Sequence, residues 1–244
     1  MIIAEIGKNH HGLEDYAKEY LKKSIVSGVD GVLFHIREKK FYQESGNKKK
    51  SLPNSFYKNA IKYTRKKEKK IGITLADIEK IDFLEDIGVD FYKILSQDIN
   101  NKNLIKTVLE TKKPVYISTG LSDFTEISKL IHFIKPYLKN VRLIHTTISP
   151  DIKNVNLNAI RKLSEKFHIP VAFGNHCENP LVIFTAIAYK PSDIFFYVKG
   201  SKFKQHQDDL HAIKLEDLKW YVKNIKELEL SLGKETKIKL SAPP

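Results

Sequence analysis

The chain has 244 residues, of which 41% are hydrophobic and 10% aromatic, so it can bury a large core and is not expected to be disordered. Its formal net charge is +13, but the lysines are spread over nearly every expected helix and no aromatic-plus-basic RNA motif occurs. These observations argue against a nucleic-acid partner. The positive charge then indicates either phosphorylated substrates or simply a lysine-rich surface.

The predicted strands are eight short apolar runs at roughly even spacing, with helical periodicity between them. Such runs are typical of strands buried on both faces. Strand then helix, repeated along a chain of about 250 residues, predicts a single-domain (β/α)₈ TIM barrel, an α/β fold, over residues 1–244. The runs are Ile2–Ile6, Gly31–Ile36, Ile71–Ala76, Phe91–Leu95, Pro114–Ser118, Val141–His145, Pro170–Phe173 and Ile194–Val198.

Helices are predicted between these strands, and the first has an apolar stripe and a glycine stop at Gly28. The basic segment 37–50 fits neither pattern, and we interpret it as a solvated insertion rather than a flexible lid. The predicted helices are Glu14–Ser27, Ser55–Lys69, Ile78–Ile87, Asn103–Thr111, Thr125–Tyr137, Asn156–Phe167, Leu181–Ala188 and Leu215–Leu230.

Only one cysteine, Cys177, is present, which excludes a disulfide framework or a cysteine-based zinc cluster within the chain. A single thiol suits a reducing cytosol, so we expect a cytoplasmic protein. No apolar stretch reaches the length of about 18 residues that a membrane span needs, and the N-terminus enters a strand without the regions of a signal peptide. We therefore expect no membrane partner.

Polar residues cluster at the ends of the predicted strands, where a TIM barrel carries its active site. Ser118-Thr119-Gly120, followed by a helix, can hold a phosphate through hydroxyls and backbone N–H groups. Lys93 and Lys113 can supply positive charge, although Lys113 stands at the start of its strand. The sequence is equally consistent with Lys93 as an interior lysine paired with an acid such as Glu5, because a buried charge requires a partner.

Several histidines also follow the strands. His176, His206 and His211, together with Asp208, can ligate a divalent metal through imidazole and carboxylate groups, but no H-E-x-x-H motif supports a metal site. His145 reads equally well as an interior imidazole that makes its own hydrogen bond.

Short motifs recur in a fixed order at these strands. Together they resemble the sialic acid (N-acetylneuraminate) synthase family, and the similarity covers nearly the whole chain. The motifs are Ile3-Ala4-Glu5-Ile6-Gly7 with Asn9-His10 and Gly12; Phe83 to Asp90 with Tyr92-Lys93-Ile94 and Ser96; Lys113-Pro114 with Ser118-Thr119-Gly120; His145-Thr146-Thr147 with Val155 to Ile160; and Asn175-His176.

The resemblance implies a barrel that condenses phosphoenolpyruvate with an N-acylated amino sugar to a nonulosonic acid and releases phosphate. In that family a divalent metal, usually manganese, is held by two histidines and polarises the sugar aldehyde. The resemblance makes Glu5 the catalytic acid or base. The other candidates are Lys93, Ser96, Lys113, Ser118, Thr119 and Asp208 for the substrates, and His176 with His206 for manganese or magnesium.

The chain departs from the family at two anchors. Leu33 stands where the family has a phosphoenolpyruvate-binding lysine, and Tyr197 stands where it has its second metal histidine. We also expect the family's C-terminal antifreeze-like domain to be absent, so that any homodimer would use another surface. Three hypotheses remain: a synthase of this type, an enzyme with altered chemistry, and a non-catalytic binding or regulatory partner in surface-sugar biosynthesis.

Overall fold

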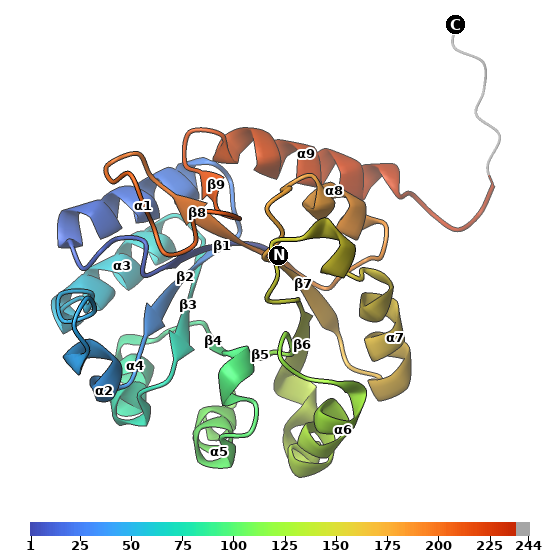
Figure 1. The fold of residues 1–244 in the computed structure, drawn as a ribbon, viewed down its shortest axis with the longest axis horizontal. Coiled ribbons are helices and arrows are strands. Elements are labelled where there is room, and N and C mark those ends of the chain that lie inside the picture. The colour runs from blue at the N-terminus through green and yellow to red at the C-terminus, as the bar shows by residue number, and fades with distance from the viewer. Residues whose placement is uncertain (238–244) are drawn as a thin grey trace, which may run out of the picture.

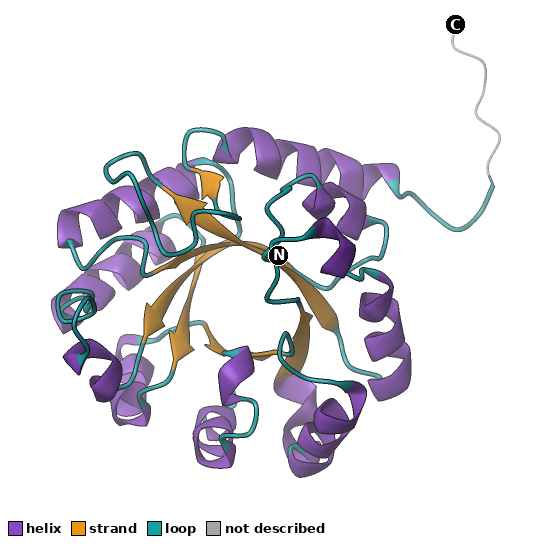
Figure 2. Ribbon diagram, viewed as in Figure 1, coloured by secondary structure: helices purple, strands orange, loops and turns teal. Residues whose placement is uncertain are grey.

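The computed structural model describes residues 1–237, and it is a closed barrel of parallel strands with helices outside it (Figures 1 and 2). Strands β1 to β8 pair in chain order, and β1 also pairs with β8, which closes the ring. The predicted TIM barrel is therefore confirmed. Residues 238–244 of the predicted domain lie outside the described residues.

The strands closely follow the apolar runs of the sequence. A two-residue strand, β9, was not predicted and extends the pairing of β8. The strands are β1 (Ile2–Gly7), β2 (Gly31–Ile36), β3 (Lys70–Leu75), β4 (Phe91–Ile94), β5 (Val115–Ser118), β6 (Val141–His145), β7 (Val171–Asn175), β8 (Ile194–Lys199) and β9 (Ile213–Lys214).

The helices also agree with the periodicity, with two differences. The helix predicted over 125–137 ends at Phe133, and a 3₁₀ turn containing Pro136 follows, because proline cannot continue an α-helix. The segment 37–50 contains a short helix, α2, that was not predicted. The helices are α1 (Glu14–Val26), α2 (Lys39–Gln43), α3 (Asn54–Lys66), α4 (Ile81–Ile87), α5 (Lys102–Glu110), α6 (Phe124–Phe133), α7 (Asn158–Phe167), α8 (Val182–Ile187) and α9 (Leu218–Ser231).

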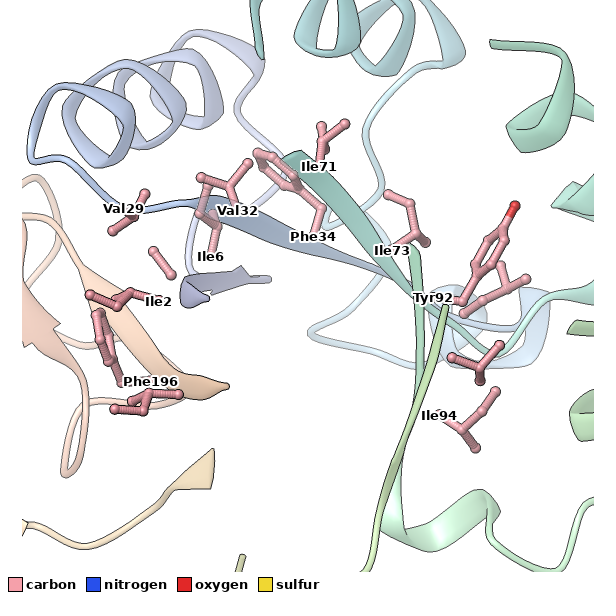
Figure 3. Close-up of a cluster of buried hydrophobic side chains, with 14 of the residues drawn as sticks. Ile2, Ile6, Val29, Val32, Phe34, Ile71, Ile73, Tyr92, Ile94 and Phe196 are labelled. Atoms are coloured by element: carbon pink, nitrogen blue, oxygen red, sulfur yellow. The ribbon is translucent and has the colours of Figure 1, made fainter. Parts of the chain in front are cut away.

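Alternate residues of each strand face the helices, since strand side chains point to opposite sides in turn. Figure 3 shows this outer layer, with Val32 and Phe34 of β2 and Ile71 and Ile73 of β3 buried in one cluster. The helices cover it with their apolar stripes, and the predicted stripe of α1, which includes Tyr16 and Tyr20, is buried. Among the described residues, no helix has the length and apolar character to cross a bilayer.

The remaining strand residues fill the interior of the barrel. Seven of them form a separate apolar cluster that is almost completely buried: Ile3, Leu33, Phe91, Tyr116, Ile144, Ala172 and Phe195. Two positions further along their strands, towards the C-terminal end, come Glu5, His35, Lys93, Ser118 and Tyr197. The apolar layer therefore closes the barrel below, and the polar layer faces the mouth, where TIM barrels carry their chemistry.

Candidate active site at the barrel mouth

The centre of the polar layer is an ion pair between β1 and β4. Lys93 Nζ donates to both carboxylate oxygens of Glu5, at 2.6 and 2.7 Å, and both side chains are almost fully buried. His35 Nε2 lies 3.7 Å from Glu5 Oε2, which is too long for a hydrogen bond. Lys93 therefore meets both predictions, because it is an interior lysine paired with Glu5 and it also brings positive charge to the mouth of the barrel.

The charge states of this cluster follow from its burial. Burial alone would raise the pKa of Glu5, but Lys93 and His35 outweigh it and lower that pKa to about 2. Burial lowers the pKa of His35 to about 4, so its imidazole is neutral near pH 7. The pair is thus a carboxylate against an ammonium, with a neutral imidazole beside it.

A pair of hydroxyls lies where β4 and β5 end. Ser96 Oγ and Ser118 Oγ are 2.7 Å apart, and the backbone N–H of Gly120 donates to Ser96 Oγ at 3.0 Å. Thr119 differs, because its hydroxyl donates to the carbonyl oxygen of Ile144 at 2.9 Å. Two of the three predicted hydroxyls are therefore held together, while the third is used by the backbone of β6.

His176, at the end of β7, lies beside His211 from the loop after β8, with ring centroids 4.8 Å apart. Its Nδ1 is 2.7 Å from Thr146 Oγ1, and within residues 1–237 its Nε2 makes no hydrogen bond. His211 Nε2 is buried, and none of the described residues gives it a hydrogen-bond partner. Tyr197 packs against both rings, at centroid distances of 5.5 and 5.2 Å.

Asp208 connects this histidine pair to the ion pair. Its Oδ1 lies 3.8 Å from His211 Nε2, too far for a hydrogen bond but within ion-pair range if the histidine is protonated. Burial and the negative charge of Glu5 raise the pKa of Asp208 to about 7. A carboxyl group with such a pKa can hold or release a proton near neutral pH.

Two predicted site residues lie elsewhere. Lys113 precedes β5 and pairs with Glu85 at 2.8 Å, so it stands at the opposite end of the barrel, because parallel strands all begin there. His206 Nε2 is 3.2 Å from the hydroxyl of Tyr16, and its ring faces Asp209 rather than His176. The structure thus places Lys113 and His206 away from the group at the mouth, and it places His211 beside His176.

His145 has the structural role that its sequence context allowed. Its Nε2 lies 2.9 Å from the carbonyl oxygen of Val155, and burial lowers its pKa. The imidazole is therefore a neutral group that anchors the loop after β6.

A family model described as the NeuB family matches residues 20–237. The chain belongs to the NeuB family. The resemblance seen in the sequence motifs is thereby confirmed.

Relatives of known name are synthases of acidic sugars. The N,N'-diacetyllegionaminic acid synthase of Legionella pneumophila is 30% identical over 95% of this chain and 73% of its own length. The N-acetylneuraminate-9-phosphate synthase of Homo sapiens is 24% identical over 97% of this chain and 72% of its own. The chain thus spans about three quarters of the length of these enzymes.

A solved structure shares the fold over almost the whole chain. It is the N-acetylneuraminic acid synthetase of Leptospira borgpetersenii in complex with citrate, with a TM-score of 0.90. The match covers 99% of this chain and 87% of the other, at 24% sequence identity. At this identity the likeness supports the barrel fold.

The histidine pair is the part of the site whose chemistry fits a metal ion. Burial lowers the pKa of His176 to about 3 and that of His211 to about 4, so both rings are neutral, as metal ligation requires. Within residues 1–237, no three His, Cys, Asp or Glu side chains are grouped closely enough to form a metal cage. His176 and His211 are the residues that could hold a divalent ion, whose other positions would be filled by substrate and water.

Proposed function

We propose that this NeuB-family barrel condenses phosphoenolpyruvate with an N-acylated amino sugar to a nonulosonic acid, with release of phosphate. The observation that carries the proposal is the convergence of a buried carboxylate, its lysine, a hydroxyl pair and two neutral imidazoles at one mouth. Each group matches one requirement of the reaction: a proton carrier, a phosphate site and a site for a polarised aldehyde.

Lys93 and the hydroxyls of Ser96 and Ser118 would bind the phosphate of phosphoenolpyruvate. A phosphate that draws hydrogen bonds from Lys93 weakens the grip of this lysine on Glu5. The pKa of Glu5 then rises from about 2 towards the range in which it can exchange protons. Binding of the first substrate would thus convert a structural ion pair into an acid–base catalyst.

The sugar would bind on the opposite side of the polar layer, beside His176 and His211. A divalent ion held by these two imidazoles would polarise the sugar aldehyde. Asp208, with a pKa of about 7, can accept a hydrogen bond from a sugar hydroxyl or protonate the developing alkoxide. The C–C bond would then form between C3 of phosphoenolpyruvate and the aldehyde carbon, whose oxygen takes up the carbonyl electron pair and a proton. Water would add to C2 and lose a proton, and the C2–O bond to phosphate would break, which leaves a ketone at C2 and releases inorganic phosphate.

The direct test is phosphate release from phosphoenolpyruvate with manganese and N-acetylmannosamine or a 2,4-diacetamido sugar, together with detection of the new acid by mass spectrometry. Ser118→Ala should lower kcat/KM by about 10²-fold, because it removes one phosphate-binding hydroxyl and leaves the ion pair intact. Lys113→Met is the matched control at the other end of the barrel. A wild-type protein that binds phosphoenolpyruvate but yields neither product with any of these sugars would contradict the proposal.

A second candidate is a barrel that binds these ligands without catalysis. Leu33 and Tyr197 favour it, because they replace the family's lysine and metal histidine with side chains that supply neither a cation nor an imidazole. It predicts a thermal shift with phosphoenolpyruvate or manganese and no turnover, so the same assay separates the two functions.

A further inference from the structure

Lys8 is a lysine whose side chain is mostly buried at the barrel mouth. It follows β1 directly, its residue is only 5% exposed, and within residues 1–237 its ammonium makes no hydrogen bond or ion pair. The stem of the side chain is enclosed, while the ammonium itself is not sealed from solvent and can reach a ligand at the mouth. The described residues leave its three N–H donors to an external ligand.

A second cation shares the same aromatic neighbour. Lys8 Nζ lies 4.0 Å from the centroid of the Phe41 ring in α2, and Arg37 Cζ lies 4.7 Å from it. The Nε and one terminal NH₂ of Arg37 are bound to Glu38, both at 2.9 Å. Among the described residues the other terminal NH₂ group of Arg37 has no hydrogen-bond partner, so it can donate to a ligand.

The segment that carries Phe41 is seated against the loop after β1. A side-chain carbon added at Gly12 would lie 1.5 Å from the carbonyl oxygen of Lys49, so only glycine permits this approach. The φ of +77° at Gly12 is also one that favours glycine. Figure 1 shows α2 as a separate short helix outside the barrel. The insertion thus has a defined position at the mouth.

The charges around Lys8 place it next to the proposed active site. Its positive charge lowers the pKa of His35, and it counteracts the rise in the pKa of Asp208. Burial and Arg37 lower the pKa of Lys8 itself to about 8, so it remains mostly protonated at pH 7. Two cations that share one aromatic neighbour, and whose charges act on each other, favour an anion beside them.

We propose that Lys8 and Arg37 form a phosphate-binding subsite at the rim of the barrel mouth, a step that rests on the proposed function for the identity of the substrate. A phosphate monoester suits this pair, because it can accept hydrogen bonds from an ammonium and a guanidinium at once. The phosphate belongs either to phosphoenolpyruvate or to a phosphorylated amino sugar. In the first case, Lys8 supplies the charge that Leu33 lacks.

The first experiment measures binding by isothermal titration calorimetry with three probes, each titrated separately: phosphoenolpyruvate, inorganic phosphate and a hexosamine 6-phosphate. Lys8→Met keeps the length of the side chain and removes its charge. The control Lys40→Met removes the same charge from an exposed position of α2. We expect Lys8→Met to weaken binding of at least one of these probes by about tenfold or more, and Lys40→Met to change it by less than about twofold.

The second experiment identifies the source of the phosphate through the Michaelis constants of the two substrates. If Lys8→Met raises the KM of phosphoenolpyruvate with every sugar, the subsite binds the phosphoenolpyruvate phosphate. If it raises only the KM of the phosphorylated sugar, the subsite reads the sugar phosphate. If Lys8→Met and Lys40→Met bind each of the three phosphates with equal affinity, the proposed phosphate subsite is wrong. Loss of phosphate binding in a protein without turnover would instead retain the subsite and contradict the proposed function.

Discussion

Replacing Glu5 with glutamine should destabilise the fold as well as stop the chemistry. The exchange leaves the Lys93 ammonium buried with one amide oxygen in place of a carboxylate that it contacts twice. Removing one partner of a buried pair costs about 3–5 kcal/mol, and the retained amide contact favours the lower end. At about 2–4 °C per kcal/mol for a chain of this size, the melting temperature should fall by roughly 6–12 °C.

The lowered pKa of Glu5 gives a second estimate of how much the ion pair stabilises the fold, and this estimate agrees with the first. The pKa of Glu5 is lowered from 4.5 to about 2 in the folded protein. At about 1.4 kcal/mol for each tenfold change in the ionisation constant, this lowering contributes about 3 kcal/mol of stability above pH 4.5. Because the folded-state pKa is the lower one, that contribution is lost as the pH falls from about 4.5 to 2. The stability gap between wild type and Glu5→Gln should narrow over the same window.

The assay is denaturant unfolding of wild type, Glu5→Gln and the double variant Glu5→Gln/Lys93→Met, at pH 7 and at pH 3. The double variant removes both charges and should recover most of the loss, because an uncharged pair leaves no buried ammonium unpaired. A Glu5→Gln protein as stable as wild type at pH 7 would refute the reasoning. So would a double variant no more stable than the single one.

Three further outcomes follow from the positions of individual side chains. His211→Ala should abolish a manganese-dependent rise in melting temperature, whereas His206→Ala should retain it; the reverse result would restore His206 as the ligand. Lys113→Met should leave the KM of phosphoenolpyruvate unchanged and lower the free energy of unfolding by less than about 1 kcal/mol, because its pair with Glu85 is partly exposed. Ser118→Ala should weaken phosphate binding measured by calorimetry about tenfold, and an unchanged affinity would remove the hydroxyl pair from the phosphate site.

The fold could be predicted from the sequence because a barrel strand buried on both faces is a short apolar run. Gly31–Ile36 and Val141–His145 match the structure at both ends. The helix α2 could not be predicted, because Lys39–Gln43 contains no apolar period and is held by Phe41 against residues far from it in the chain. Tertiary contact, rather than local pattern, therefore decides the structure of this segment.

The sequence could predict which residues reach the candidate site only where those residues lie in a strand. The register of β1 and β4 brings Glu5 and Lys93 together, so the position of each along its strand was sufficient. The loop after β8 has no such period, and the sequence could not distinguish His206 from His211 there. Lys8 was missed for the opposite reason, since a single lysine between Gly7 and Asn9 carries no signal until its burial is known.

The position of Leu33 in the barrel changes the interpretation of the lysine that it replaces. Leu33 does not leave the polar layer one cation short, because it lies in the apolar layer below, buried with Ile3 and Phe91. A lysine at that position would have to extend past this layer to reach the mouth, where Lys93 already holds a positive charge. The chain instead closes the layer with leucine and places its additional cations, Lys8 and Arg37, above the polar layer. Loss of the lysine therefore argues for a relocated phosphate contact as readily as for a lost one, and the affinity of Lys8→Met for phosphate decides between them.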